Sequence, residues 1–287
     1  MRNLNESNLT EVVVAGLAGT ADPRLRAVLE NLVRHLHAFV RETELTLPEW
    51  FAGIQFLTAT GQKCDDKRQE YILLSDTLGI SMLVDAINHR RPSGATETTV
   101  LGPFYVPGST DMPPWGDIAE GVAGVPAYVS GRVLDLRGRP IAGATLDVWQ
   151  TDGDGLYGVQ RYAGERPSYA RGKFKSGADG GYGFRTVRPV SYQIPTDGPV
   201  GVLLRATGRH PNRPAHVHTI VSAPGYKPVT THLFVAGDPF LDSDAVFAVK
   251  ESLIVRFEDH PAGKTPAGTT SNVPFCTAHY DFKLVEQ

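Results

Sequence analysis

The stretch Arg213-Pro-Ala-His-Val-His218 decides how this chain is interpreted. In a β-strand successive side chains point to opposite faces, so His216 and His218 would lie side by side while Val217 faces the other way. The β-branched residues 219–221 continue the strand. Imidazole is the commonest protein ligand for metals, and two on one face can hold a single ion. Taken alone, a His-x-His sequence is explained better by a strand with two hydrogen-bonded histidines than by a metal site. The choice between the two therefore depends on the rest of the sequence.

Size and charge narrow the class of protein. The chain has 287 residues, 41% of them hydrophobic, and a net charge of -3. A sizeable core is therefore expected, and the lack of a basic run argues against nucleic acid or an anionic membrane as partner. Cys64 and Cys276 are the only cysteines, which fits a reducing compartment. Residues 12–19 are too short to span a bilayer and lack a basic leader, so we expect a cytoplasmic protein without membrane insertion.

The first 90 residues predict helices. Asp22-Pro23 is typical of a helix start, with an N-cap and then proline at the first helical position. From there apolar residues recur at steps of three and four, at Leu25, Val28, Leu29, Leu32, Val33, Leu36 and Val40. A second helix is predicted from Thr46 to Gly61. A third is predicted from near Asp65 to Arg91, with an interruption at Gly79.

After Pro92 the sequence changes to short β-type runs separated by Gly and Pro. The pattern predicts strands at 128–135, 141–149, 181–186, 200–206, 217–222, 230–235 and 279–285. We read the first two as a strand, a glycine turn and a second strand, forming a hairpin. The fold class predicted is α+β, with a helical part over residues 1–95 and an antiparallel β-sandwich over residues 96–287.

Two tyrosines lie in Gly- and Pro-rich loops beside these strands, where side chains can converge on a site. Tyr157 belongs to Asp154-Gly-Leu-Tyr-Gly158, and Tyr192 follows Arg188-Pro-Val-Ser. Taken singly, each is better explained as a half-buried aromatic residue with a hydrogen-bonded hydroxyl. Taken with His216 and His218, they form a set of two imidazoles and two phenolates. Phenolate oxygen is hard and anionic, and with a free pKa near 10 it stays ionised only on a strong Lewis acid, so the set predicts Fe(III).

The motifs around these residues resemble the intradiol ring-cleaving dioxygenases. The resemblance rests on Leu101-Gly-Pro-Phe-Tyr-Val-Pro-Gly108, Asp147-Val-Trp-Gln150, Gly155-Leu-Tyr157, Arg188-Pro-Val-Ser-Tyr192 and Arg213-Pro-Ala-His-Val-His218. It extends from about Asp22 to Leu284. It implies that Tyr157, Tyr192, His216 and His218 bind non-haem Fe(III), that Tyr192 accepts a substrate proton, and that Arg213 lies beside the bound ring.

The resemblance also implies a substrate pocket. Matching positions that would contact the substrate are Leu73, Asp76, Val100, Leu101, Gly102, Pro103, Ile194, Pro195, His232 and Val246. Asp76 would accept a hydrogen bond from a third ring hydroxyl. Four further segments, 198–201, 206–211, 231–238 and 241–247, resemble the hydroxyquinol-cleaving subgroup, in which His232 replaces a glutamine of the catechol-cleaving relatives. The implied substrates are 1,2,4-trihydroxybenzene and O2, and the implied product is 3-hydroxy-cis,cis-muconate, the enol of maleylacetate.

The resemblance also implies that the chain forms a homodimer through its N-terminal helices. Some members of the family hold a phospholipid at that interface. Three alternatives remain at this point. The substrate could instead be catechol or chlorocatechol. The sandwich could be a non-catalytic binding module. His216, His218 and a carboxylate such as Asp238 could form a facial triad for Fe(II).

Overall fold

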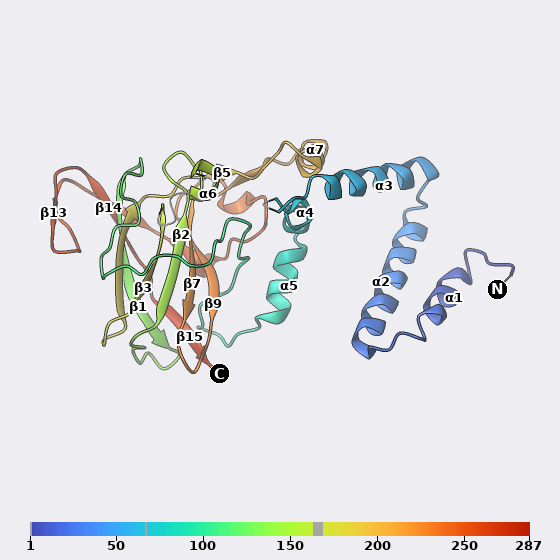
Figure 1. Ribbon diagram of the computed structural model, residues 1–287, viewed down its shortest axis with the longest axis horizontal. Coiled ribbons are helices and arrows are strands. Elements are labelled where there is room, and N and C mark those ends of the chain that lie inside the picture. The colour runs from blue at the N-terminus through green and yellow to red at the C-terminus, as the bar shows by residue number, and fades with distance from the viewer. Residues whose placement is uncertain (1, 67, 163–168) are drawn as a thin grey trace. The chain divides into compact units, whose positions relative to one another are not determined.

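The predicted strand at the two histidines exists, and it lies inside a five-stranded sheet of the computed structural model (Figure 1). The structure describes residues 2–66, 68–162 and 169–287. In this sheet the strand order is β10-β9-β7-β2-β3. The bounds are β10 Ile254–Val255, β9 Val229–Val235, β7 His216–Ser222, β2 Thr145–Gln150 and β3 Arg171–Lys175. Neighbours in the sheet are antiparallel except β10 and β9, which are parallel.

A second, six-stranded sheet completes the sandwich. Its order is β11-β14-β1-β15-β8, and β4 pairs with the free side of β1. The bounds are β11 Phe257–His260, β14 Phe275–His279, β1 Pro126–Asp135, β15 Phe282–Glu286, β8 Tyr226–Lys227 and β4 Gly181–Val187. Here β1 runs parallel to both β14 and β15, so this sheet is mixed where the sequence predicted antiparallel pairing. Two short ribbons join β12 (Gly263–Lys264) to β13 (Thr270–Ser271) and β5 (Tyr192–Gln193) to β6 (Asn212–Arg213).

The core fills the space between the two sheets. Alternate residues of each strand point inward, because side chains in a strand have a period of two. The inward set from the five-stranded sheet is Leu146, Val148, Val217, Val221, Val229, Leu233 and Val235, and the six-stranded sheet contributes Val129, Val133, Phe184, Ala278, Phe282 and Leu284. His216 and His218 alternate with Val217 and therefore lie on the other face of their sheet, outside this core.

The three predicted helical stretches are present, and the structure has further helices outside them. They are α1 Leu9–Gly16, α2 Pro23–Glu42, α3 Leu47–Gln62, α4 Glu70–Thr77, α5 Ile80–Asn88, α6 Gly158–Tyr162 and α7 Pro199–Ala206, with 3-10 turns at η1 Leu241–Ser243 and η2 Glu251–Leu253. Asp22 caps α2 by accepting the amides of Arg24 (2.8 Å) and Leu25 (3.2 Å), as predicted. Gly79, with φ +73°, separates α4 from α5, also as predicted. The first helix was not predicted.

Three predicted elements are wrong. Residues 200–206 form helix α7, because Pro199 starts a helical turn and an apolar run of that length fits helix or strand alike. The first two strands are not a hairpin: β1 and β2 belong to different sheets, so the segment between them crosses the sandwich. Residues 279–285 are not one strand, since β14 ends at His279 and β15 begins at Phe282.

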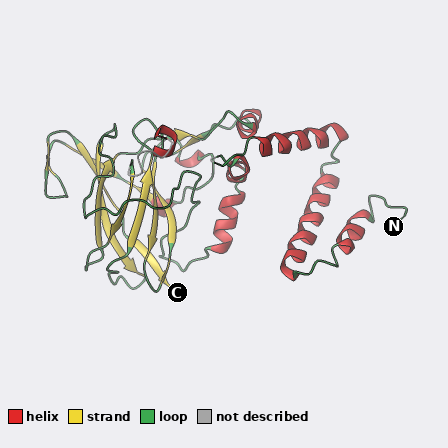
Figure 2. Cartoon of the chain, in the orientation of Figure 1, coloured by secondary structure: helices red, strands yellow, loops and turns green. Residues whose placement is uncertain are grey.

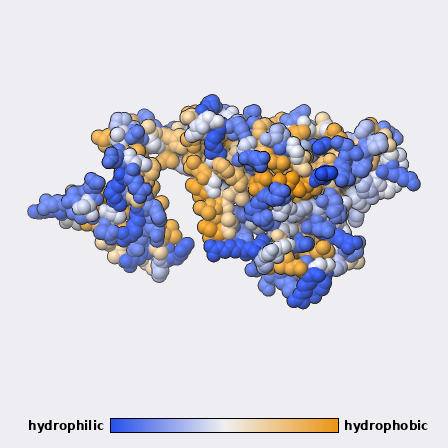
Figure 3. Space-filling view, turned by 180° about the vertical axis from the view of Figure 1, so that it is seen from behind, coloured by the Kyte–Doolittle hydropathy of each residue, from blue (hydrophilic) through white to orange (hydrophobic). Residues whose placement is uncertain are grey.

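The chain divides into two units, residues 1–59 and 60–287, and every strand among the described residues belongs to the second. Figure 2 draws these strands in yellow. Helices α4 and α5 belong to the second unit, packed on each other and, through α4, on α7. The predicted domains 1–95 and 96–287 stay a prediction. Apolar side chains are exposed on α3 and α5, among them Trp50, Ile54, Leu83 and Ile87. Figure 3 shows exposed hydrophobic residues of the chain in orange. Within the described ranges, no helix has both the length and the hydropathy needed to cross a membrane.

Candidate metal centre

His216 and His218 lie in a row of rings across the outer face of the five-stranded sheet. Trp149 of β2 pairs with His218, and His218 pairs with His232 of β9. Trp149 stacks on His218 with a centroid separation of 4.6 Å and an interplanar angle of 13°. Both ligating histidines predicted from sequence are 2% exposed, so they are buried although they lie outside the main core.

Tyr157 reaches the histidines from the loop that follows β2. Asp152 organises this loop, because its carboxylate accepts the amides of Asp154 (2.9 Å) and Leu156 (3.0 Å) and pairs with Arg161 (2.6 Å). Gln160 accepts the amide of Tyr157 itself at 2.9 Å. The phenol ring is 2% exposed and stacks on Phe104 at 4.7 Å.

Tyr192 comes from the short strand β5, which pairs with β6 so that Tyr192 lies opposite Arg213. Its ring meets that of Tyr157 edge to face at 5.4 Å. Two segments that are distant in sequence thus place both phenol oxygens at the imidazoles.

The four donor atoms converge on one point. The Tyr157 hydroxyl lies 3.2 Å from the Tyr192 hydroxyl, 2.9 Å from His218 Nε2 and 3.5 Å from His216 Nε2, and the two Nε2 atoms are 3.1 Å apart. Ligands that share one ion at about 2 Å are separated by such distances. The predicted quartet is therefore brought together, and it can hold a metal ion.

The protonation states suit metal binding. His216 directs Nδ1 at the Pro214 carbonyl (2.7 Å), which leaves the Nε2 lone pair facing the cluster. Burial, with the Arg213 charge adding to it, lowers the pKa of His216 to about 3, and burial holds the pKa of His218 well below its usual value. Both rings are therefore neutral at pH 7. Burial also raises the pKa of Tyr157 well above 10, so this phenol ionises only next to a cation.

Arg213 is the charged neighbour of this cluster. Its Nη1 lies 3.4 Å from the Tyr192 hydroxyl and 3.5 Å from His216 Nε2. Asp244 binds the other side of the guanidinium, with Nε–Oδ1 at 3.1 Å and Nη2–Oδ2 at 3.3 Å. Burial raises the pKa of Asp244, but Arg213 and the Ala248 amide outweigh it and hold that pKa below its ordinary value. The pair is thus a buried ion pair beside the quartet.

His232 lies against both histidines of the quartet, with ring centroids 4.1 Å from His218 and 4.6 Å from His216. Its Nδ1 is hydrogen-bonded to the Thr99 hydroxyl. Its Nε2 is buried and has no hydrogen-bond partner among the described residues. Among these residues, the group of His, Cys, Asp and Glu side chains whose ligand atoms converge is His216, His218 and His232, within 4.8 Å.

The Fe(II) facial triad is not what the structure assembles. Asp238 uses its two carboxylate oxygens to accept the amides of Ala215 (3.0 Å) and Phe240 (2.9 Å). It anchors the start of β7 and is absent from the converging group above.

A pocket of about 510 Å³ adjoins the centre and contains half of the predicted substrate contacts. Asp76 and residues 100–103 line it, together with Ile72 and Val84. Gly102 forms the wall against the metal site, since a Cβ there would lie 3.1 Å from His218 Cε1. Asp76 is 5% exposed, and burial raises its pKa above the usual value. The Arg213 charge acts in the opposite direction on this pKa, but burial outweighs it.

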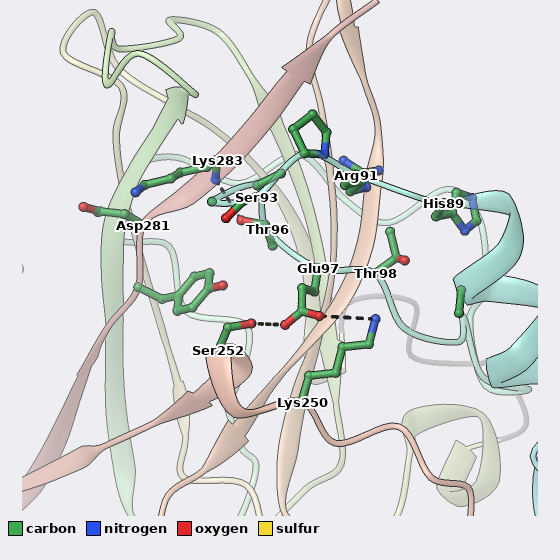
Figure 4. Close-up of a pocket in the computed structure, with 15 residues that line it drawn as sticks. His89, Arg91, Ser93, Thr96, Glu97, Thr98, Lys250, Ser252, Asp281 and Lys283 are labelled. Carbon is green, nitrogen blue, oxygen red and sulfur yellow. Dashed lines mark hydrogen bonds and ion pairs between the residues drawn. The ribbon is translucent and has the colours of Figure 1, made fainter.

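The other predicted contacts lie elsewhere. Leu73, Ile194 and Val246 are buried and Pro195 is half-buried, and they are not part of this pocket's lining. Their role in binding stays a prediction. A separate pocket of about 650 Å³ lies between residues 89–98, η2 and β15 (Figure 4). Glu97 lies inside it, paired with Lys250 at 3.8 Å and bonded to the Ser252 hydroxyl. Within the described part of the chain its lining contains no member of the quartet.

Sequence reasoning missed the residues that hold the quartet in place. Phe104, Trp149 and Asp244 lie within the motifs and segments named above, but the sequence predicts no role for them or for Thr99. Their signals in the sequence are weak, because each acts through a partner that is distant along the chain. Asp244 and Arg213, for example, are 31 residues apart.

Two family profiles together match most of this chain. The profile described as "Dioxygenase" matches residues 101–285, and "Catechol dioxygenase N terminus" matches residues 22–96. The 6-chlorohydroxyquinol 1,2-dioxygenase of Cupriavidus pinatubonensis is 54% identical over 88% of this chain and 92% of its own length. The hydroxyquinol 1,2-dioxygenase of Nocardioides simplex is 49% identical over 97% of this chain and 95% of its own.

A solved structure agrees with these sequences. Hydroxyquinol 1,2-dioxygenase from Pseudomonas putida DLL-E4 superimposes with a TM-score of 0.93 at 51% identity, covering 98% of this chain and 99% of that one. Both the helical part and the sandwich are shared. With two profiles that together span most of its length, the chain belongs to the intradiol ring-cleavage dioxygenases.

Proposed function

We propose that this protein cleaves hydroxyquinol (1,2,4-trihydroxybenzene) with O2 between its two adjacent hydroxylated carbons. Both oxygen atoms of O2 remain in the product, 3-hydroxy-cis,cis-muconate, the enol of maleylacetate. The observation that carries the proposal is the convergence of two phenol oxygens and two imidazole nitrogens at 2.9 to 3.5 Å. Relatives named for hydroxyquinol cleavage, at 47–54% identity, support the choice of substrate.

The proposed cofactor is a single non-haem Fe(III), held by Tyr157, Tyr192, His216 and His218. The residues fit this ion because two hard phenolates and two neutral imidazoles match a hard, highly charged cation. Tyr157 supports this choice, because its buried phenol needs such a cation to ionise. When bound, the Fe(III) would supply a Lewis acid that draws electron density from both oxygens of the diol.

The chain's own residues would do the rest. Tyr192 would accept a substrate proton at its phenolate oxygen, because a phenolate that leaves a cation regains its basicity. Arg213, with Nη1 at 3.4 Å from that oxygen, would stabilise negative charge that develops there without reorganising. His232 would face the same space with its unpartnered Nε2. Gly102 and Pro103 would exclude water on the pocket side.

The experiment that tests the function is O2 uptake by the iron-loaded protein, with hydroxyquinol and catechol at equal concentration and correction for autoxidation. We expect a strong preference for hydroxyquinol. Preference for catechol would support the alternative that this is a catechol or chlorocatechol 1,2-dioxygenase. No uptake from either diol, in a protein that binds iron, would contradict the proposal and favour the non-catalytic binding module.

Asp76 is proposed to bind the third hydroxyl of the substrate. A site built around a substrate hydroxyl loses most when that hydroxyl's partner is removed. Asp76→Ala should therefore lower kcat/KM for hydroxyquinol by about tenfold more than kcat/KM for catechol. Steady-state kinetics on both substrates measure the ratio, and Asp66→Ala, an exposed aspartate just before α4, is the control. Equal losses on both substrates would contradict the proposed contact.

We also propose the assembly and setting that the family resemblance implies. The apolar side chains of α2, including Leu25, Leu32 and Leu36, are about half exposed in the single chain. A surface of this kind fits a homodimer interface, and a phospholipid could fill an apolar tunnel beside it. The proposed location is the cytoplasm, which agrees with the free thiols of Cys64 and Cys276.

A further inference from the structure

Arg213 is held in one orientation by contacts on one edge of its guanidinium. The side chain is 4% exposed. Its Nε and Nη2 donate hydrogen bonds to the two carboxylate oxygens of Asp244, at 3.1 and 3.3 Å. A guanidinium is planar, so fixing two of its nitrogens fixes the third. The nitrogen left over, Nη1, is the one that faces the Tyr192 hydroxyl and His216 Nε2.

Asp244 is itself fixed by the backbone that follows it. Its carboxylate accepts the amides of Val246 (3.3 Å) and Ala248 (3.0 Å). The turn that aims both amides at one side chain requires Phe247 to adopt φ +60°, a conformation that costs free energy for an aromatic residue. Arg209 braces the same turn, with Nη2 donating to the Ala245 carbonyl at 3.0 Å and its guanidinium 4.8 Å from the Phe247 ring.

From this geometry we infer that Asp244 is a positioning residue for the ring-cleavage reaction, acting through Arg213. The strained turn holds the carboxylate, the carboxylate holds the guanidinium edge, and Nη1 is thereby presented to the position where negative charge develops. The ion pair also leaves the buried arginine electrically compensated in the resting protein. The inference rests on the proposed function, because it assigns Asp244 a role in that same reaction.

The first test is Asp244→Asn in the iron-loaded, full-length protein. The amide keeps the size of the carboxylate but cannot accept both guanidinium bonds. We expect kcat for hydroxyquinol to fall about 100-fold, as expected when a charge-stabilising donor is misplaced, with KM changed less than about threefold. Iron content and the visible phenolate-to-Fe(III) band of the substrate-free protein should stay as in the parent, since the four ligands are untouched.

Asp135→Asn is the matched control. Asp135 is also buried, also pairs with an arginine (Arg139, 2.5 Å) and also accepts two amides (Arg137 and Arg139, both 2.8 Å). It lies at the end of β1 in the other sheet, and none of its hydrogen bonds within the described residues involves a metal ligand. This variant should keep the parent kcat even where it loses thermal stability.

A double-mutant cycle separates positioning from folding. Arg213→Gln combined with Asp244→Asn removes both charges, so no unpaired charge stays buried. If Asp244 acts through Arg213, the double variant has the kcat of Arg213→Gln alone. Multiplicative losses, loss of iron in Asp244→Asn, or a parent-like kcat in Asp244→Asn beside a slow Arg213→Gln would overturn the inference and leave the proposed function intact. A parent protein that binds iron but consumes no O2 would overturn the function itself.

Discussion

At the scale of single residues, His218 is confined by its surroundings on more than one side. Trp149 covers one face of the ring, and Gly102 lies against its Cε1 edge. Gly102 has φ +78°, where glycine costs least, and a side chain there would also press on the imidazole. The glycine thus serves both the turn and the position of the proposed metal ligand.

Gly102→Ala should therefore weaken iron binding. The added methyl group would lie 3.1 Å from His218 Cε1 and push the ring out of line with the other donors. We expect at least about a tenfold loss of iron affinity, measured by competition with a chelator. Gly138→Ala is the control, since Gly138 has the same φ of +78° but open space around its Cα. Equal iron affinity in the two variants would show that backbone strain, and not contact with His218, is responsible.

Tyr157→Phe tests the phenolate assignment. Removing one oxygen from the quartet should lower iron affinity at least about tenfold and abolish part of the visible charge-transfer absorption. Tyr182→Phe is the matched control, because that tyrosine is also buried and its hydroxyl donates to the Tyr280 carbonyl at 2.7 Å, away from the quartet. Absorption that is unchanged in Tyr157→Phe would mean that this tyrosine is not a ligand.

At the scale of elements, the loop from β2 to α6 depends on one carboxylate. Asp152 is 1% exposed, and its carboxylate accepts four hydrogen bonds. Two come from backbone amides, one from the Arg161 guanidinium and one from the Tyr169 hydroxyl. Burial raises the pKa of Asp152, but these four partners outweigh it and hold the pKa below its ordinary value. The ionised form is thus the one that keeps Tyr157 pointed at the histidines.

Asp152→Asn should lower the free energy of unfolding at pH 7 by about 2 kcal/mol, because charge-assisted hydrogen bonds are lost. The folded-state pKa is depressed, so the parent's advantage is present above the unfolded pKa of about 3.9 and disappears as pH falls below it. Urea unfolding of the iron-free proteins between pH 7 and pH 3 measures the difference. An advantage that persists unchanged at the acid end would rule out the ionised carboxylate as its source.

The elements also show what a single sequence can predict. The spacing of His216 and His218 predicts that they share one face of a strand, because the period of two is a local property of the backbone. The cap that Asp22 forms on α2 is also predictable, because it involves only neighbouring residues. Helix α7 was misjudged because its start is stabilised from outside: the buried Glu70 of α4 accepts the Val200 amide at 3.1 Å. The Arg213–Asp244 pair was invisible because no local pattern joins residues 31 positions apart.

At the scale of the whole molecule, the helices of the described chain expose a series of large apolar side chains, a feature typical of interaction surfaces. Helix α1 meets α2 through polar contacts, with Thr10 bonded to His37 (3.0 Å) and Arg41 (2.8 Å). The apolar stripe of α2 is left open, with Leu32 50% and Leu36 53% exposed. A second copy of the chain would cover such a stripe.

Leu32→Glu should therefore weaken the proposed dimer by more than about tenfold, because a charge would be buried in an apolar contact. Sedimentation velocity over a range of protein concentrations measures the change. Arg24→Glu, a charge reversal at an exposed position of the same helix, should leave the dimer intact. A parent protein with monomer mass at all concentrations would refute the dimer.

The stacking of Trp149 on His218 has an optical consequence. The indole is 3% exposed and its Nε1 has no hydrogen-bond partner among the described residues, so its fluorescence should be emitted at short wavelength. A coloured iron–phenolate centre bound to the stacked imidazole would lie close enough to quench the fluorescence of Trp149. Emission from Trp149 would then fall as iron is loaded and recover as it is removed. Trp50 and Trp115 pack instead against Phe51 and Tyr128, so Trp149→Phe should remove most of the iron-dependent change. The protein would thus report its own metal occupancy by light, without substrate and without turnover.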